Sequence, residues 1–137
     1  MYCAAGRLGP SLAAAIAAVV LALPAPAAAT DWSAAQTITV VAKEYRFKPK
    51  QLIFQRGVAY RLHIDNRGKE THEFHAPEFF QAIEIADPSV LNADKTEIVI
   101  PPGDARDLTF VAPQAGRYRL ICSDHDWAGM TGKIRVK

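Results

Sequence analysis

Residues 117–137 read RYRLICSDHDWAGMTGKIRVK and place three metal-binding side chains on the turn of an expected β-hairpin. Cys122, His125 and Met130 follow the spacing C-x2-H-x4-M. A thiolate, an imidazole and a thioether, joined by a second imidazole, are the donor set of a copper electron-transfer centre. The stretch therefore predicts a copper site that still lacks one histidine, which must come from elsewhere in the chain.

The first 29 residues have the pattern of a secretory signal peptide. One basic residue, Arg7, precedes an apolar run over residues 12–23, and the small residues Ala27 and Ala29 fit a cleavage site. The run is shorter than the roughly 20 residues of a membrane-spanning helix, so we expect no membrane insertion after cleavage. We predict a signal peptide over residues 1–29, one domain over residues 30–137, and a periplasmic location.

Cleavage would leave Cys122 as the single cysteine and Met130 as the single methionine, because the others are Cys3 and Met1. A lone cysteine cannot form an internal disulfide, and a free thiol in an oxidising compartment is a liability unless it binds something. A buried free Cys and a core Met are each ordinary packing residues. Their occurrence on one loop with His125 between them favours metal binding.

The charge of the chain is almost balanced, with 16 Lys and Arg against 14 Asp and Glu. We therefore expect neither nucleic acid nor an acidic membrane as a partner, and we expect a monomer. The sequence shows no paired carboxylates placed for acid–base chemistry, no nucleophile–base signature and no phosphate loop. A hydrolytic or group-transfer enzyme is not expected.

The remaining chain has the pattern of an all-β protein. From Val58 to Ile64 every even position is apolar, which predicts a half-buried strand. Further strands are expected at residues 37–42, 52–54, 72–74, 97–100, 108–111, 118–122 and 134–136, between Gly, Pro and Asn turns. About eight short strands predict a Greek-key β-sandwich. Residues 76–95 fit a helix or a strand, and both interpretations stay open.

The missing imidazole has a candidate in Thr71-His72-Glu73-Phe74. His72 and His75 lie three positions apart, so in an extended strand they face opposite sides and only one can enter the site. Alternation alone leaves open which of the two is the ligand. His63 falls on the polar face of its strand, where a solvated side chain is the simpler interpretation.

The C-terminal hairpin closely resembles the copper loop of plastocyanin-like cupredoxins. The matching run is Gly116-x-Tyr118-x3-Cys122-Ser123-x-His125-x2-Ala128-Gly129-Met130-x-Gly132-Lys133-Ile134-x-Val136. Phe47-x-Pro49, Gly57 and Asn66…His72 are similar to the N-terminal half of the same family. The resemblance implies a type 1 copper protein with the cupredoxin fold, in which His72, Cys122, His125 and Met130 bind one copper ion.

The same resemblance implies transfer of single electrons through a solvent-facing edge of His125, with a redox partner docking near His125 and Trp127. For Trp127, a docking residue and a partly buried lid are equally good interpretations. Glu73 stands where the family usually has Asn, whose side chain ties the ligand loops together. A carboxylate accepts but does not donate hydrogen bonds, so this tie should be weakened. Asp124 and Asp126 flank His125, and their negative charge near the metal should favour Cu(II) and lower the reduction potential.

Two other functions stay open. Oxidation of Fe(II) or Cu(I) in a metal uptake system would use a second cation site made of Glu73, His75, Glu78 and Glu84, for which a solvated acidic loop is the simpler interpretation. The second open function is that of a copper carrier, which would deliver metal instead of electrons. Zinc suits the site less well, because it gains nothing from a thioether and binds less tightly than copper.

Overall fold

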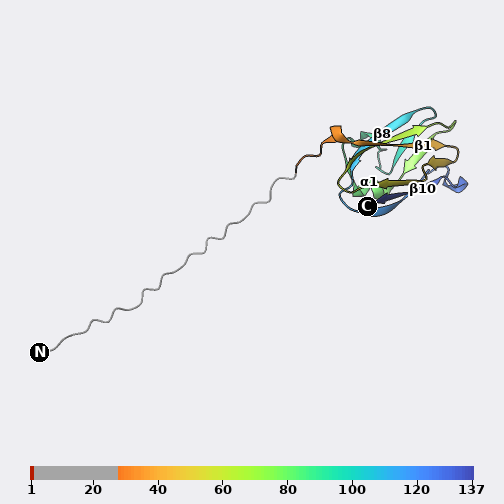
Figure 1. Ribbon diagram of the computed structural model, residues 1–137. Coiled ribbons are helices and arrows are strands. Elements are labelled where there is room, and N and C mark those ends of the chain that lie inside the picture. The colour runs from red at the N-terminus through yellow and green to blue at the C-terminus, as the bar shows by residue number, and fades with distance from the viewer. Residues whose placement is uncertain (2–27) are drawn as a thin grey trace.

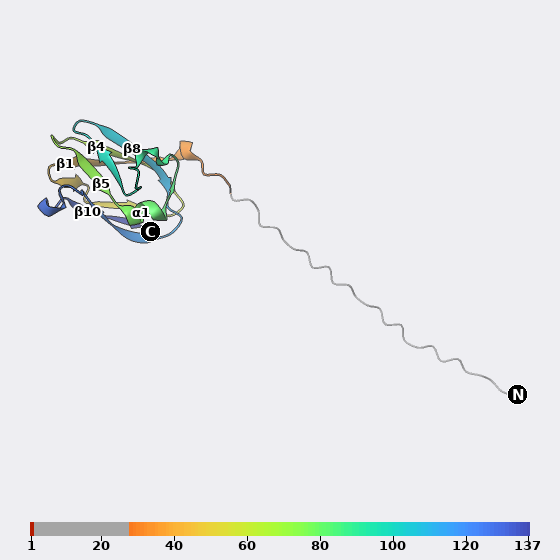
Figure 2. The same cartoon turned by 180° about the vertical axis from the view of Figure 1, so that it is seen from behind.

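The computed structural model describes Met1 and residues 28–137, so the signal peptide predicted over residues 1–29 lies almost wholly outside the described residues. Residues 36–136 form two five-stranded sheets packed face to face, seen from opposite sides in Figure 1 and Figure 2. The predicted β-sandwich is confirmed. The described chain has ten strands, whereas about eight were predicted. The two additional strands are short, and the sequence showed no clear pattern for them.

The first sheet has the strand order β2-β1-β4-β8-β6. Its strands are β1 (Gln36–Lys43), β2 (Arg46–Lys48), β4 (Ala59–Asn66), β6 (Glu84–Ile85) and β8 (Ala105–Val111). The second sheet has the order β3-β10-β9-β5-β7. Its strands are β3 (Gln51–Phe54), β5 (His72–His75), β7 (Glu97–Ile100), β9 (Gly116–Ile121) and β10 (Thr131–Val136). β1 runs parallel to β4, and β3 runs parallel to β10. Because β2 belongs to the first sheet and β3 to the second, the chain crosses between the sheets after β2.

The core lies between the two sheets and is rich in aromatic rings. Along β4, Tyr60, Leu62 and Ile64 are buried, as the alternation predicted. The ring of Phe54 lies 5.0 Å from that of Phe110 in an edge-on contact and 6.0 Å from that of Phe79 in a stacked one. Such contacts add to the free energy gained by burying each ring.

Residues 76–95 contain both a helix and a strand, so neither open interpretation alone describes them. They form α1 (Pro77–Ala82), β6 and a short 3-10 turn, η2 (Pro88–Val90). Phe79 and Phe80 of α1 are buried, and the helix closes one end of the core. Within the described residues, no helix is long and apolar enough to cross a membrane.

The loop between β9 and β10 carries three of the four predicted copper ligands. It contains η3 (Asp126–Ala128), whereas η1 (Trp32–Ala34) precedes β1. In Figures 1 and 2 the dark-blue loop projects from the end of the sandwich away from residue 28. The site therefore lies at the end of the molecule opposite the N-terminal segment.

Candidate metal centre

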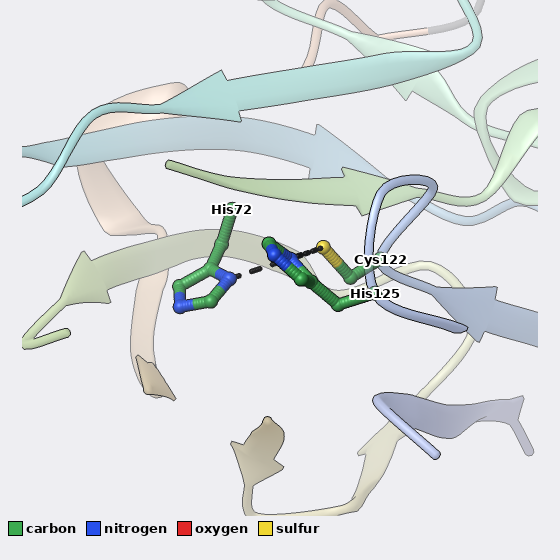
Figure 3. A group of neighbouring side chains, drawn as sticks. All are labelled: His72, Cys122 and His125. Carbon is green, nitrogen blue, oxygen red and sulfur yellow. Dashed lines mark hydrogen bonds between the residues drawn. The ribbon is translucent and has the colours of Figure 1, made fainter. Parts of the chain in front are cut away.

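His72, Cys122 and His125 each bring one donor atom to within 4.8 Å of the other two. Nδ1 of His125 lies 3.3 Å from Sγ of Cys122, and Nδ1 of His72 lies 3.9 Å from it. Figure 3 shows a nitrogen of each ring turned toward the sulfur. Among residues 28–137, no other group of three His, Cys, Asp or Glu side chains meets this criterion.

The position of His72 depends on the loop between β4 and β5. Asn66 is fully buried, and its side-chain amide donates hydrogen bonds of 2.8 Å to the carbonyls of Glu70 and Ile100. Its Oδ1 accepts from the backbone N–H of Gly68 at 2.9 Å. Asn66 thus fixes residues 66–71 from inside, and His72 enters β5 in a single register, opposite Ile100.

The C-terminal loop positions the other predicted ligands through its own backbone. The N–H of Cys122 donates to the carbonyl of Met130 at 2.9 Å, and the N–H of Met130 donates to that of His125 at 3.3 Å. Gly129 closes η3 with φ at 83°, a left-handed conformation that glycine adopts without strain. Met130 is fully buried. The loop therefore holds all three residues in one tight turn.

Burial sets the charge state of the metal-free site. Cys122 and His72 have no exposed surface. Burial raises the pKa of Cys122 to about 12. The pKa of His72 is lowered mainly by burial and to a smaller extent by repulsion from His125. Without a metal both side chains are therefore neutral at pH 7. A bound cation reverses this preference for the thiol, because coordination releases its proton.

Both histidines face a carboxylate on the side of the ring away from the sulfur. Nε2 of His125 lies 2.8 Å from Oε2 of Glu70, and Nε2 of His72 lies 3.7 Å from Oε1 of Glu44. The Glu44 carboxylate is held in place by the backbone N–H groups of Lys69 and Glu70, which lower its pKa. Glu70 is therefore close enough to orient the His125 ring and make it more basic. Nε2 of His72 has no hydrogen-bond partner among the described residues, so Glu44 acts on that ring through its charge alone.

Glu73 lies against the sulfur of Cys122. The thiol donates to Oε2 of Glu73 at 3.0 Å, and the backbone N–H of Glu73 lies 3.4 Å from the same sulfur. The carboxylate also accepts from the N–H of Asp124 at 3.4 Å. Glu73 therefore does connect β5 to the C-terminal ligand loop, as the acceptor of hydrogen bonds from Cys122 and Asp124. This contact explains why Glu73 is buried against the alternation of β5.

The prediction of a solvent-facing edge on His125 is wrong. Its side chain is only 12% exposed, because Glu70 faces Nε2 and the ring of Tyr45 lies 4.9 Å away. Trp127 is 77% exposed, which excludes the buried lid. Its ring lies 6.0 Å from that of Tyr45, and its N–H donates to the carbonyl of Asp124 at 2.9 Å. Tyr45 thus covers the imidazole, and Trp127 lies on the outer side of Tyr45.

The two other histidines of the described chain stand outside the cluster. Nδ1 of His75 lies 3.2 Å from Oε2 of Glu97, which also accepts from the hydroxyl of Ser123 at 2.7 Å. Nδ1 of His63 lies 2.6 Å from Oδ1 of Asp107, so this histidine is paired and not merely solvated. The choice of His72 over His75 as the residue that enters the site agrees with this geometry.

The second cation site suggested for Glu73, His75, Glu78 and Glu84 is not assembled. Glu73 lies at the sulfur and His75 at Glu97. Glu78 and Glu84 are exposed on α1 and β6. These four side chains form no three-membered group of potential ligands in the described part of the chain.

Three residues that build the site were missed in the sequence, Glu44, Tyr45 and Glu70, and Asn66 was noted only as part of the family resemblance, without its role in the loop. Glu70 precedes His72 by only two positions, so its proximity could have been inferred. Asn66 opens an Asn-Arg-Gly turn, a weaker signal of the same kind. Glu44 and Tyr45 reach the site from a distant turn, and no local pattern marks them.

The donors present fit copper. Two imidazoles, one thiol and a thioether on the same loop form the set typical of a type 1 copper site. Hard cations such as Mg²⁺ and Ca²⁺ prefer six or more oxygen ligands, whereas the three carboxylates here stand behind the donor atoms. The cofactor of this site is copper.

Several solved structures share the fold. Auracyanin B is 21% identical with a TM-score of 0.56, covering 75% of this chain and 89% of its own. Auracyanin A, a "blue" copper protein from Chloroflexus aurantiacus, is 24% identical with a TM-score of 0.54, covering 74% and 98%. The McoA multicopper oxidase of Aquifex aeolicus is 13% identical with a TM-score of 0.61, covering 80% and 31%.

At these identities the structural matches show the fold alone. No curated protein matches the sequence. The sequence model of the cupredoxin-like domain, in contrast, matches residues 12–136, which is most of the chain. With the two-sheet sandwich and the cluster of His72, Cys122 and His125 in place, the chain belongs to the cupredoxin-like domain family.

Proposed function

We propose that this protein carries single electrons between redox partners by cycling one copper ion between Cu(I) and Cu(II). The observation that carries the proposal is the convergence of Nδ1 of His72, Nδ1 of His125 and Sγ of Cys122 in a buried position. Copper held by such donors would exchange one electron and would need no open position for a substrate. Met130, on the same loop as Cys122 and His125, would supply a thioether.

The residues around the metal support this role because they are fixed. His72 belongs to β5, which pairs with β7 and β9. Cys122 and Met130 are joined by a backbone hydrogen bond of 2.9 Å. A close-packed interior resists displacement of these side chains when the charge of the site changes by one. Little structural rearrangement then opposes electron transfer.

We place the docking of the redox partner at the aromatic end of the sandwich. Trp127 is 77% exposed and Tyr45 37% exposed, and exposed aromatic residues are common in protein interfaces. The Tyr45 ring lies between His125 and Trp127, at 4.9 and 6.0 Å from their rings. Because Glu70 covers the imidazole edge, electrons would pass the aromatic pair and not a bare histidine.

A periplasmic location is part of the proposal. It is supported by the signal-like pattern of residues 1–29 and by the absence of a second cysteine after residue 29. Fractionation of cells that produce the full chain would test it. Recovery of a shortened, copper-binding form in the periplasm is expected, and an uncleaved form in the cytoplasm would contradict it.

Electron transfer is separated from metal delivery by repeated redox cycling. The copper-loaded protein is reduced with ascorbate and reoxidised with ferricyanide in the presence of a Cu(I) chelator. The buried ligands predict that copper is kept over many cycles, whereas loss of copper to the chelator in the first cycles would favour delivery. Addition of Fe(II) is expected to reduce the copper without saturable binding, since the second cation site is not assembled.

A further inference from the structure

The outer face of the second sheet carries a ladder of positive charge. Arg119 and Arg117 on β9 lie directly opposite Lys133 and Arg135 on β10. All four side chains are exposed, because alternate residues of a strand point to the same face. Like charges directly opposite each other destabilise a sheet. The pattern therefore does not serve folding, and we name these four residues the basic face.

The basic face has no internal charge balance. In the described part of the chain, none of its four cations lies within ion-pair distance of a carboxylate. On the first sheet, by contrast, Arg61 pairs with Asp107 at 3.4 Å and Arg106 with Asp104 at 3.2 Å. Many other Lys and Arg residues of the described chain also lack an ion pair, so the distinguishing feature of this face is that four cations lie directly opposite one another on two neighbouring strands.

The four side chains line an open depression of about 720 Å³. Gln51, Tyr118, Thr131, Gly132 and Ile134 complete its lining, and no acidic residue contributes to it. A Cβ at Gly132 would lie 2.9 Å from the carbonyl oxygen of Lys50, so the chain passes close to β10 here. Lys50 is exposed and adds a further cation beside the face.

We propose that the basic face is a second contact surface for the redox partner that docks at Trp127 and Tyr45, and that it binds a carboxylate-rich surface of this partner protein. Three of its four cations are arginines, whose planar guanidinium groups bind carboxylates through two parallel hydrogen bonds. Binding to a bilayer surface would favour an amphipathic helix, and the described structure has none beside the basic face. A protein partner therefore fits better than a lipid. This deepens the proposed function, because β9 ends beside Cys122 and β10 begins after Met130.

The test uses a peptide of ten aspartates as the probe and the ¹⁵N-labelled protein at low ionic strength. Binding is expected to shift the amide signals of β9, β10 and β3. The variant R119Q/R135Q should bind about tenfold more weakly, since rim charges dominate such encounters and salt screens them. The matched control R61Q/R106Q has the same net charge and should lose less than about twofold.

Other outcomes overturn the proposal. An equal loss of peptide affinity in the two double variants would mean that binding depends only on the net charge of the protein. Shifts confined to the Trp127 end would assign acidic partners to a different surface. Tighter binding to phosphatidylglycerol vesicles than to the peptide, lost in R119Q/R135Q, would make the face a membrane site. Circular dichroism checks that each variant is folded, and K133Q provides a second variant. Because the test needs no copper, it can fail without the redox proposal failing.

Discussion

Oε2 of Glu70 lies 2.8 Å from Nε2 of His125, and this contact joins the two loops that carry the predicted copper ligands. Glu70 precedes His72 by two positions on the β4–β5 loop, whereas His125 belongs to the C-terminal loop. The same carboxylate accepts a hydrogen bond of 3.2 Å from the hydroxyl of Tyr45. One side chain therefore fixes an imidazole, covers its edge and places negative charge next to it.

Replacing Glu70 by Gln should raise the reduction potential of the copper centre. The negative charge of the Glu70 carboxylate favours Cu(II), and the variant lacks this charge. A tenfold change in the relative affinity for the two oxidation states equals about 59 mV for one electron. We expect a shift of about that size, since the carboxylate is 47% exposed and partly screened. Redox titration measures it, with E84Q on the exposed strand β6 as the control; a fall in potential would contradict the account.

Replacing Glu73 by Gln should raise the potential further than E70Q does. Its carboxylate is only 5% exposed and lies 3.0 Å from the sulfur in the metal-free state, so its charge is screened less by water and salt. The order of the two shifts should persist at high ionic strength. A smaller shift in E73Q than in E70Q would show that the buried carboxylate is not charged when copper is bound.

The C-terminal half of the site could be predicted from sequence because it is local. Cys122, His125 and Met130 lie on one turn, and their spacing alone specifies the donor set. His72 lies 50 positions before Cys122. Strand alternation showed only that one of His72 and His75 could enter the site, and the resemblance to plastocyanin-like cupredoxins selected His72. The β-sandwich followed from the same alternation in β4.

The layer of carboxylates behind the ligands could not be predicted in the same way. Glu44 reaches the backbone N–H of Glu70 across 26 positions, and that distance is closed only when β1 pairs with β4. Glu73 broke the alternation because a buried contact with Cys122 outweighed its polarity. The edge of His125 was expected to be open because nothing near it in sequence marks Tyr45 as its cover.

The aromatic core should dominate the stability of the fold. Phe54 is 1% exposed and contacts the rings of Tyr60, Phe79 and Phe110. Phe54→Ala should lower the free energy of unfolding by about 3–5 kcal/mol, through lost burial and the cavity left behind. Chemical denaturation of the copper-free protein measures this. Val99→Ala, at a position 42% exposed, should change it by less than about 0.5 kcal/mol.

The copper-free protein should lose stability as the pH rises above about 9. Burial raises the pKa of Cys122 from its ordinary 9.0 to about 12. Between these values the unfolded chain gives up the thiol proton and the folded chain keeps it. The unfolded state then binds fewer protons, so the free energy of unfolding falls with rising pH.

Denaturation at a series of pH values, with C122A as the control, tests this expectation. The variant should lack the part of the slope that comes from the thiol. The copper-loaded protein should lack it as well, because coordination has already removed the proton. Identical slopes in the parent and in C122A would contradict the expectation.

The visible absorption spectrum after addition of Cu(II), recorded beside C122A, tests the central claim most directly. A trigonal Cu(II)–thiolate centre should give an intense band at roughly 600 nm. We expect this band in the parent protein at one copper per chain and its complete loss in C122A. A colourless protein, or a weak band that survives the loss of Cys122, would mean that the cupredoxin fold is present without a working type 1 site.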